Sequence, residues 1–149
     1  MPNLNQQLSR QMLIFHRLYN EKISRRIRAI HVDELSQAEF LLLAIVLEDG
    51  GIAMTRLVTR SNMKKQQVNR MVNQLEEKGL LVRQKSDTNR RTVQLVPTEA
   101  ARELQRQVIR EIESELANVF SPLEESAATE YLQAIQTINR IMEQFPEGT

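Results

Sequence analysis

The 149-residue sequence contains no cysteine and only four glycines and four prolines. The absence of cysteine excludes a disulfide framework, a thiolate zinc site and a cysteine redox switch. The scarcity of glycine and proline excludes collagen-like and glycine-rich disordered chains. Only Gly50 and Gly51 are adjacent, whereas a Walker loop or a dinucleotide-binding fingerprint needs several closely spaced glycines.

Long apolar runs are also missing, since none approaches the roughly 18 residues of a membrane span. The segment Met1–Gln6 lacks the basic and then apolar layout of a signal peptide. We therefore expect a cytoplasmic protein with no membrane partner. The length suits a single domain, residues 1–149, with a substantial core.

Charge is unevenly distributed, although the formal net charge is only +1. Residues 54–91 hold ten Lys or Arg against three acidic residues, whereas residues 98–149 hold four Arg against ten acidic residues. A basic middle between acidic flanks is typical of a polyanion-binding surface. A solvated charged surface is the alternative interpretation, so the secondary structure must decide between them.

Two helices are predicted in the first third of the chain. Residues 4–30 carry apolar side chains at mostly helical steps, which indicates a long amphipathic helix. Ser36 and Glu39 have the spacing of a capping box, in which each side chain bonds the other residue's backbone N–H. The apolar run 40–47 then predicts a buried central helix that ends at Asp49-Gly50-Gly51.

The middle of the chain reads as a helix-turn-helix followed by a hairpin. Residues 54–60 form a short helix, and Asn62 in the next turn tolerates the left-handed conformation. Lys64–Lys78 forms a second helix, closed by Gly79. Residues 80–85 and 92–96 read as two strands joined by a polar turn. This order predicts a winged helix-turn-helix over residues 36–97.

The chain ends in two more predicted helices. One of about twenty residues follows Pro97-Thr98, and a second is expected to start at a capping box over residues 121–124. Helices 4–30 and 98–145 carry apolar stripes that a lone winged domain would leave exposed, which marks an interface. The predicted fold class is mainly α with a small β-hairpin wing: a winged helix-turn-helix with long N- and C-terminal dimerisation helices.

The helix Lys64–Lys78 has two chemically distinct faces. At 100° per residue, one face is apolar and comprises Val68, Met71, Val72 and Leu75. The opposite face comprises Gln66, Asn69, Arg70 and Asn73. Amide and guanidinium side chains read base edges in the DNA major groove. An ordinary solvated face would mix Glu with Lys.

Four further cations flank this helix. Lys64 and Lys65 lie near its start, where DNA phosphates are bound. Arg90 and Arg91 at the hairpin tip are placed to enter the adjacent minor groove, although a solvated turn is the alternative. We therefore predict a DNA-binding protein. The alternative is a winged-helix protein-interaction module without DNA binding, whose groove face would carry acidic or large apolar residues.

The chain resembles the MarR family of bacterial transcriptional regulators over most of its length. The resemblance depends on Leu35-Ser36-Gln37-Ala38-Glu39-Phe40, on the segment from Val68 to Leu80, on Asn89-Arg90-Arg91 and on Thr98-Glu99. It implies a homodimer, major-groove reading by Lys64–Lys78 and minor-groove insertion of Arg91. The family's usual wing, Asp-Pro-x-Asp-Arg-Arg, is replaced here by Ser86-Asp87-Thr88-Asn89-Arg90-Arg91.

A two-fold dimer places its reading helices one DNA turn apart, so a pseudo-palindromic operator is expected. The resemblance further implies a repressor released by a small aromatic or phenolic ligand. His16 and Tyr19 are candidates to line its pocket, or else ordinary interface residues. His16 and His31 lack a second ligand cluster, so no metal is expected. No cofactor and no catalytic residue is predicted, because no nucleophile–base or paired-carboxylate pattern is present.

Overall fold

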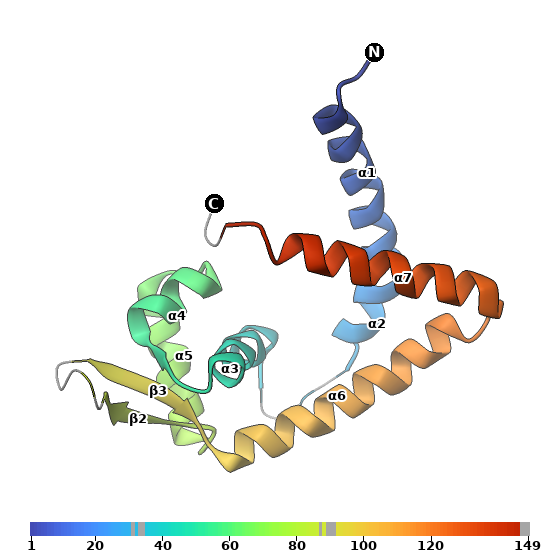
Figure 1. Ribbon diagram of the computed structural model, residues 1–149. Coiled ribbons are helices and arrows are strands. Elements are labelled where there is room, and N and C mark those ends of the chain that lie inside the picture. Colours follow the sequence, from blue (N-terminus) through green and yellow to red (C-terminus); the bar gives the residue numbers. More distant parts are fainter. Residues whose placement is uncertain (31, 33–34, 87, 89–91, 147–149) are drawn as a thin grey trace. The chain divides into compact units, whose positions relative to one another are not determined.

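The computed structural model describes residues 1–30, 32, 35–86, 88 and 92–146 (Figure 1). The chain forms two compact units. One comprises Met1–His31 and Arg110–Ile141, and the other comprises Val32–Ile109 with Met142–Thr149. The single-domain description of the chain stays a prediction.

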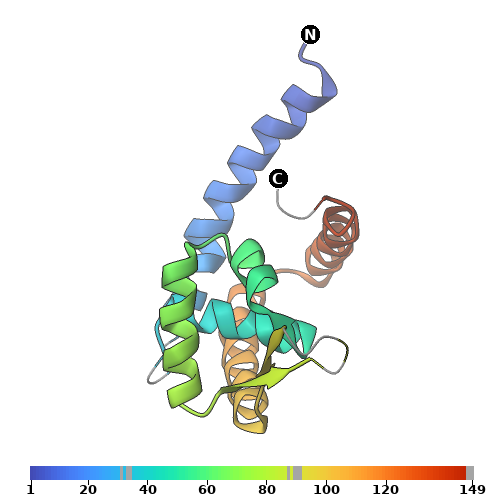
Figure 2. The same ribbon diagram turned by 90° about the vertical axis from the view of Figure 1, so that its left-hand side faces the viewer.

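The second unit is a winged helix-turn-helix, as predicted. Its helices are α3 (Gln37–Asp49), α4 (Met54–Ser61), α5 (Lys65–Glu77) and the first part of α6 (Glu99–Phe120). Its strands are β1 (Ile52–Ala53), β2 (Leu81–Lys85) and β3 (Val93–Pro97), in the antiparallel order β1-β3-β2. In Figure 2, α5 and the sheet both lie against α3.

The core of this unit surrounds α3, the helix that the sequence predicted to be buried. Leu42, Leu43 and Val46 of α3 are fully buried. Each neighbouring element adds buried apolar side chains, among them Ile52, Leu57, Val72, Leu75, Leu81 and Leu95. Because α4, α5 and β3 all pack on one central helix, the positions of the two helices of the helix-turn-helix are fixed relative to the sheet.

The helix ends follow the predicted local chemistry, with one difference. Ser36 Oγ accepts a hydrogen bond from Glu39 N at 3.1 Å, which caps α3. Glu39 does not complete a capping box, because its carboxylate accepts a 2.7 Å hydrogen bond from Lys78 Nζ instead. Gly50 ends α3 with φ of 71°, and Asn62 ends α4 with φ of 54°.

The other unit consists of helices only within the described residues. The predicted helix 4–30 is present as α1 (Leu4–Tyr19), a π-helical turn η1 (Asn20–Ser24) and α2 (Arg25–Arg28). The second part of α6 and α7 (Glu125–Met142) complete the unit. None of the helices in the described part of the chain is long and apolar enough to cross a membrane.

The capping box predicted at residues 121–124 is wrong. α7 begins at Glu125, and Ser121 lies one residue past the end of α6. Its N–H donates to Ala117 O at 2.9 Å and its hydroxyl donates to Asn118 O at 3.3 Å. A serine one residue past a helix end can satisfy that helix's last carbonyls, and here it does so instead of capping the next helix.

α1 and α7 leave large apolar side chains exposed. All residues of both helices are described, and none of them is buried. Leu4, Leu8 and Phe15 at one end of the chain and Ile138, Met142 and Phe145 at the other are at least 37% exposed. The exposure expected of these stripes in a single chain is therefore confirmed.

Candidate nucleic-acid interface

The two faces predicted for the reading helix are both present on α5. Its apolar face is buried through Val68, Met71, Val72 and Leu75. On the opposite face, Gln66, Arg70 and Asn73 are exposed and Asn69 is half-buried. The structure thus brings the four polar side chains together on one outward surface, here called the polar face of α5. Their contact with DNA stays a prediction.

The start of α5 is open to an anionic partner. Lys64 is the N-cap residue and its side chain makes no capping hydrogen bond, while Lys65, the first helical residue, is exposed. Helix N-termini carry partial positive charge and unpaired backbone N–H groups. Two lysines at this end add to that potential, so the geometry suits a phosphate.

Ion pairs divide the basic residues of the winged unit into two groups. Six basic residues pair with acidic neighbours: Arg56, Arg60, Lys78, Arg83, Arg102 and Arg106. Four others make no ion pair with any acidic residue that the structure describes: Lys64, Lys65, Arg70 and Lys85. The second group lies on α5, at its N-cap and on β2. Their positive charge is available to a polyanion.

Arg60 holds the first helix of the helix-turn-helix against α3. Its guanidinium donates to Asp49 Oδ1 at 2.8 Å and to Glu48 Oε2 at 3.0 Å. Burial lowers the pKa of Arg60, but the hydrogen bonds and charges of Glu48 and Asp49 outweigh it and raise the pKa above its usual value. The charged Arg60 side chain therefore joins α4 to the end of α3, and both of its Nη atoms already donate hydrogen bonds within the protein.

Arg83 on β2 contacts α5 and was missed by sequence reasoning. Its Nη2 donates to Asn73 Oδ1 at 2.8 Å and its Nη1 donates to Glu76 Oε1 at 2.8 Å. The sequence marked Arg83 only as one charge in a basic stretch. No local signal could reveal the contact, because it depends on β2 lying beside α5.

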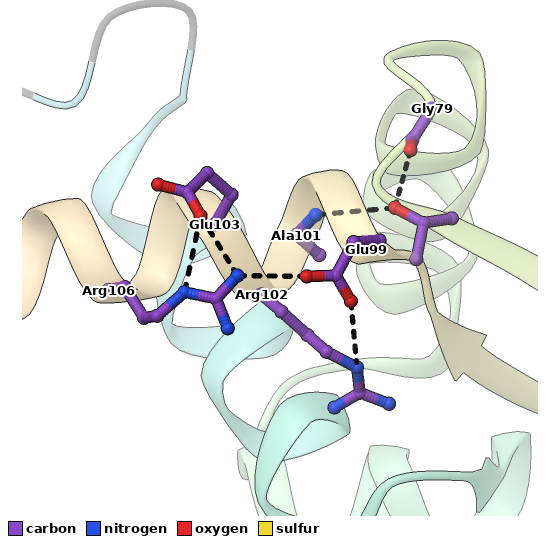
Figure 3. Close-up of polar contacts among 7 residues, drawn as sticks. Gly79, Glu99, Ala101, Arg102, Glu103 and Arg106 are labelled. Carbon is purple, nitrogen blue, oxygen red and sulfur yellow. Dashed lines mark hydrogen bonds and ion pairs between the residues drawn. The ribbon is translucent and has the colours of Figure 1, made fainter.

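Thr98 ties the end of α5 to the start of α6. Its hydroxyl donates to Gly79 O at 2.7 Å and accepts from Ala101 N at 3.3 Å, as drawn in Figure 3. Thr98 N also donates to Leu80 O at 3.1 Å. In the next turns of α6, Arg106 pairs with Glu99 and Glu103 (Figure 3). One threonine thus caps α6 and joins it to the residues that end the reading helix.

The described part of the hairpin ends just before its tip. The β2–β3 ladder runs to Lys85 opposite Val93, and Ser86 N donates to Thr92 O at 2.9 Å. Asn89, Arg90 and Arg91 lie outside the described residues. The minor-groove role of Arg90 and Arg91 therefore stays a prediction.

Of the two residues proposed to line an effector pocket, Tyr19 lines a cavity and His16 does not. A cavity of about 420 Å³ lies within the helical unit, and none of its lining residues is charged. Tyr19 lines it together with Ile23, Ile27, Leu116, Phe120, Leu123, Ala128, Tyr131, Leu132 and Ile135. His16 does not line it, and its ring nitrogens instead lie 3.2 and 3.3 Å from Asn20 Nδ2.

No metal site is found among the described residues, where no three His, Asp or Glu side chains gather. His31 lies outside the described residues.

Comparison with known proteins yields one family and several solved structures. Residues 35–93 match the model of the MarR family. No curated protein matches the chain. A MarR family protein from Bacillus stearothermophilus is 17% identical, with a TM-score of 0.79 over 95% of this chain and 100% of that one.

Two other solved structures are similar over nearly their whole lengths. The transcriptional regulator Tm0710 from Thermotoga maritima is 22% identical, with a TM-score of 0.69 over 93% of this chain and 96% of that one. BpsR from Bordetella bronchiseptica, whose DNA binding is regulated by 6-hydroxynicotinic acid, is 19% identical, with a TM-score of 0.62 over 98% and 99%. At such identities the likeness shows a shared fold.

Proposed function

We propose that this chain, whose residues 35–93 match the model of the MarR family, is a DNA-binding transcriptional regulator that acts as a homodimeric repressor. The observation that carries the proposal is the polar face of α5. It presents amides and a guanidinium outward, while the opposite side of the helix is buried in the core.

The polar face fits the major groove in size and in chemistry. The groove is about 12 Å wide and admits one α-helix. Arg70 can pair with the two acceptors of guanine, and Gln66, Asn69 and Asn73 can bond base edges. Lys64 and Lys65 at the helix start would hold phosphates and so fix the register of α5 on the duplex. Arg90 and Arg91 of the wing would enter the neighbouring minor groove.

The proposed dimer is supported by the exposed apolar stripes of α1 and α7. Exposed patches of this kind usually mark an interface between chains. A two-fold axis would set two α5 helices against half-sites one DNA turn apart, so the operator would be pseudo-palindromic. A protein-interaction module would carry acidic or large apolar residues on the polar face of α5, which has neither.

The proposed effector is a small, neutral aromatic or phenolic molecule bound in the cavity of the helical unit. The two tyrosines, Tyr19 and Tyr131, supply the only side-chain hydroxyls among the lining residues, whose other members are apolar. BpsR is regulated by an aromatic acid. The lining described here offers no cation to a carboxylate, which favours an uncharged ring.

The proposal is tested by selecting bound sequences from random duplex DNA with the full chain. We expect enrichment of a two-fold-symmetric site whose half-sites lie about 10 base pairs apart. Repeating the binding with added neutral phenols should weaken it, and Tyr19→Phe or Tyr131→Phe should reduce that response. If no sequence is enriched over the starting pool at low salt, DNA-binding regulation is rejected.

A further inference from the structure

Among the described residues, Arg83 on β2 makes a side-chain hydrogen bond to the polar face of α5. It projects from β2 and holds two side chains one helical turn apart on α5, Asn73 and Glu76, each at 2.8 Å. Its side chain is 36% exposed and that of Glu76 is 39% exposed. The contact is thus partly shielded from water.

The chemistry of the guanidinium fixes the orientation of the Asn73 amide. Arginine has five N–H donors and no acceptor. The amide atom that it contacts must therefore be the oxygen, and a rotation of the amide by 180° would set two donors against each other. Glu76 holds the other guanidinium nitrogen, so Arg83 cannot turn away without breaking a charge-assisted hydrogen bond.

This orientation limits what Asn73 can read. An asparagine pairs bidentately with adenine only if its oxygen accepts from N6 while its NH₂ donates to N7. Arg83 occupies one of the two lone pairs of the Asn73 oxygen, so the oxygen keeps one acceptor position and the NH₂ group points in a fixed direction. Guanine presents two acceptors in the major groove, O6 and N7, whereas adenine presents one acceptor beside a donor and cytosine presents a donor.

We propose that Arg83 is a specificity-determining positioning residue, which holds the Asn73 amide in one orientation and so sets which base edge Asn73 reads. The inference rests on the proposed DNA-binding function and goes beyond it. Arg83 acts through Asn73 and touches no base itself. Glu76, an acidic residue near the reading surface, has a role in the same arrangement, because it anchors Arg83.

The first experiment compares base preferences of the full chain, its Asn73→Ala variant and its Arg83→Met variant on the selected operator. Asn73→Ala identifies the base pair that Asn73 reads, because preference there becomes flat. In the unaltered protein we expect one base to be preferred at that position. Arg83→Met frees the amide to rotate, so the preference for that base over the next-best base should fall about fivefold or more, at that position only.

Lys85→Met is the matched control. Lys85 lies two residues further along β2 and is exposed. Removing its charge should weaken binding to all sequences alike, with no change of base preference. Thermal unfolding of each variant checks that the winged unit stays folded.

A double variant separates action through Asn73 from direct contact. If Arg83 works through Asn73, then Arg83→Met changes no base preference in the Asn73→Ala background. A change that persists there shows that Arg83 contacts a base directly, which overturns the inference. So does an unchanged base preference in Arg83→Met.

Failure of the proposed function is a different result. If the unaltered chain enriches no DNA sequence, the regulator assignment fails and this inference falls with it. If a site is enriched but either of the two outcomes above is found, only the role of Arg83 is lost.

Discussion

At the scale of single residues, the ends of the helices depend on backbone geometry. α5 ends in a Schellman motif, with Gly79 N bonded to Glu76 O and Leu80 N bonded to Leu75 O, both at 3.0 Å. Gly79 has φ of 73°, in the left-handed region where side chains with a Cβ are strained. Leu75 and Leu80 both belong to the core, so the motif also sets the path into β2.

The glycines allow a controlled test of this strain. A Cβ at Gly79 or Gly50 would meet no atom within 4 Å, so only the positive φ opposes a substitution. Gly79→Ala and Gly50→Ala should each lower the free energy of unfolding by about 1 kcal/mol in urea titrations. Gly51→Ala is the control, since its Cβ would make ordinary contacts at 3.5 and 3.7 Å and should change stability little. Equal losses at all three positions would contradict the argument.

Arg70 and Lys65 give a second test at the residue scale. Arg70→Ala should reduce the free energy of operator binding by roughly 1–3 kcal/mol and relax discrimination at one base step. Lys65→Ala should weaken binding to every sequence and make it less dependent on salt, as expected of a phosphate contact. Titrations against the operator and a scrambled duplex separate the two. Uniform weakening by Arg70→Ala would make Arg70 a phosphate contact instead.

At the scale of elements, helix types and faces were predicted well and contacts between elements were not. The faces of α5 follow from its own periodicity, and all four predicted apolar residues are buried. β1 was not predicted, because two residues are too few to show an alternation. β1 is a strand because it pairs with β3, with Ile52 opposite Leu95 and Ala53 opposite Gln94.

The wing is the element with a role predicted from sequence alone. Arg91→Ala should weaken operator binding while dimerisation and the thermal unfolding midpoint stay unchanged. A minor-groove contact contributes to DNA affinity without contributing to the core. Fluorescence anisotropy with labelled operator measures the affinity, and sedimentation velocity measures the dimer. An affinity equal to that of the unaltered protein would reject the wing's role.

At the scale of the whole molecule, the proposed dimer would cover the apolar stripes of the terminal helices. Leu8 on α1 is 55% exposed, and Phe145 beyond α7 is 63% exposed. Apolar burial stabilises by about 25 cal/mol per Å², so covering these stripes would give a dimer much of its stability. Regulation by a ligand would then act on the distance between two wings.

A charge placed on the α1 stripe tests the dimer. Leu8→Glu should move the protein toward monomer in sedimentation equilibrium and lower its affinity for the full operator more than for a half-site. Arg10→Glu puts the same side chain about 200° around the helix, where it should leave the dimer intact. If both variants behave alike, the stripe is not the interface.

The sequence by itself determined the elements with a strong local signal. A continuous apolar run predicted the buried α3, and periodicity predicted the two faces of α5. Gly50, Asn62 and Gly79 marked helix ends because few residues tolerate positive φ. Tertiary structure alone decided the contacts between residues far apart in the chain. The Glu39 carboxylate accepts a hydrogen bond from Lys78 instead of one from the backbone at the start of α3. Arg83 on β2 donates a hydrogen bond to Asn73 on α5. Such pairings depend on how helices and strands pack against each other. The 2.7 Å hydrogen bond from Lys78 Nζ to the Glu39 carboxylate therefore could not be predicted from the positions of the two residues in the sequence.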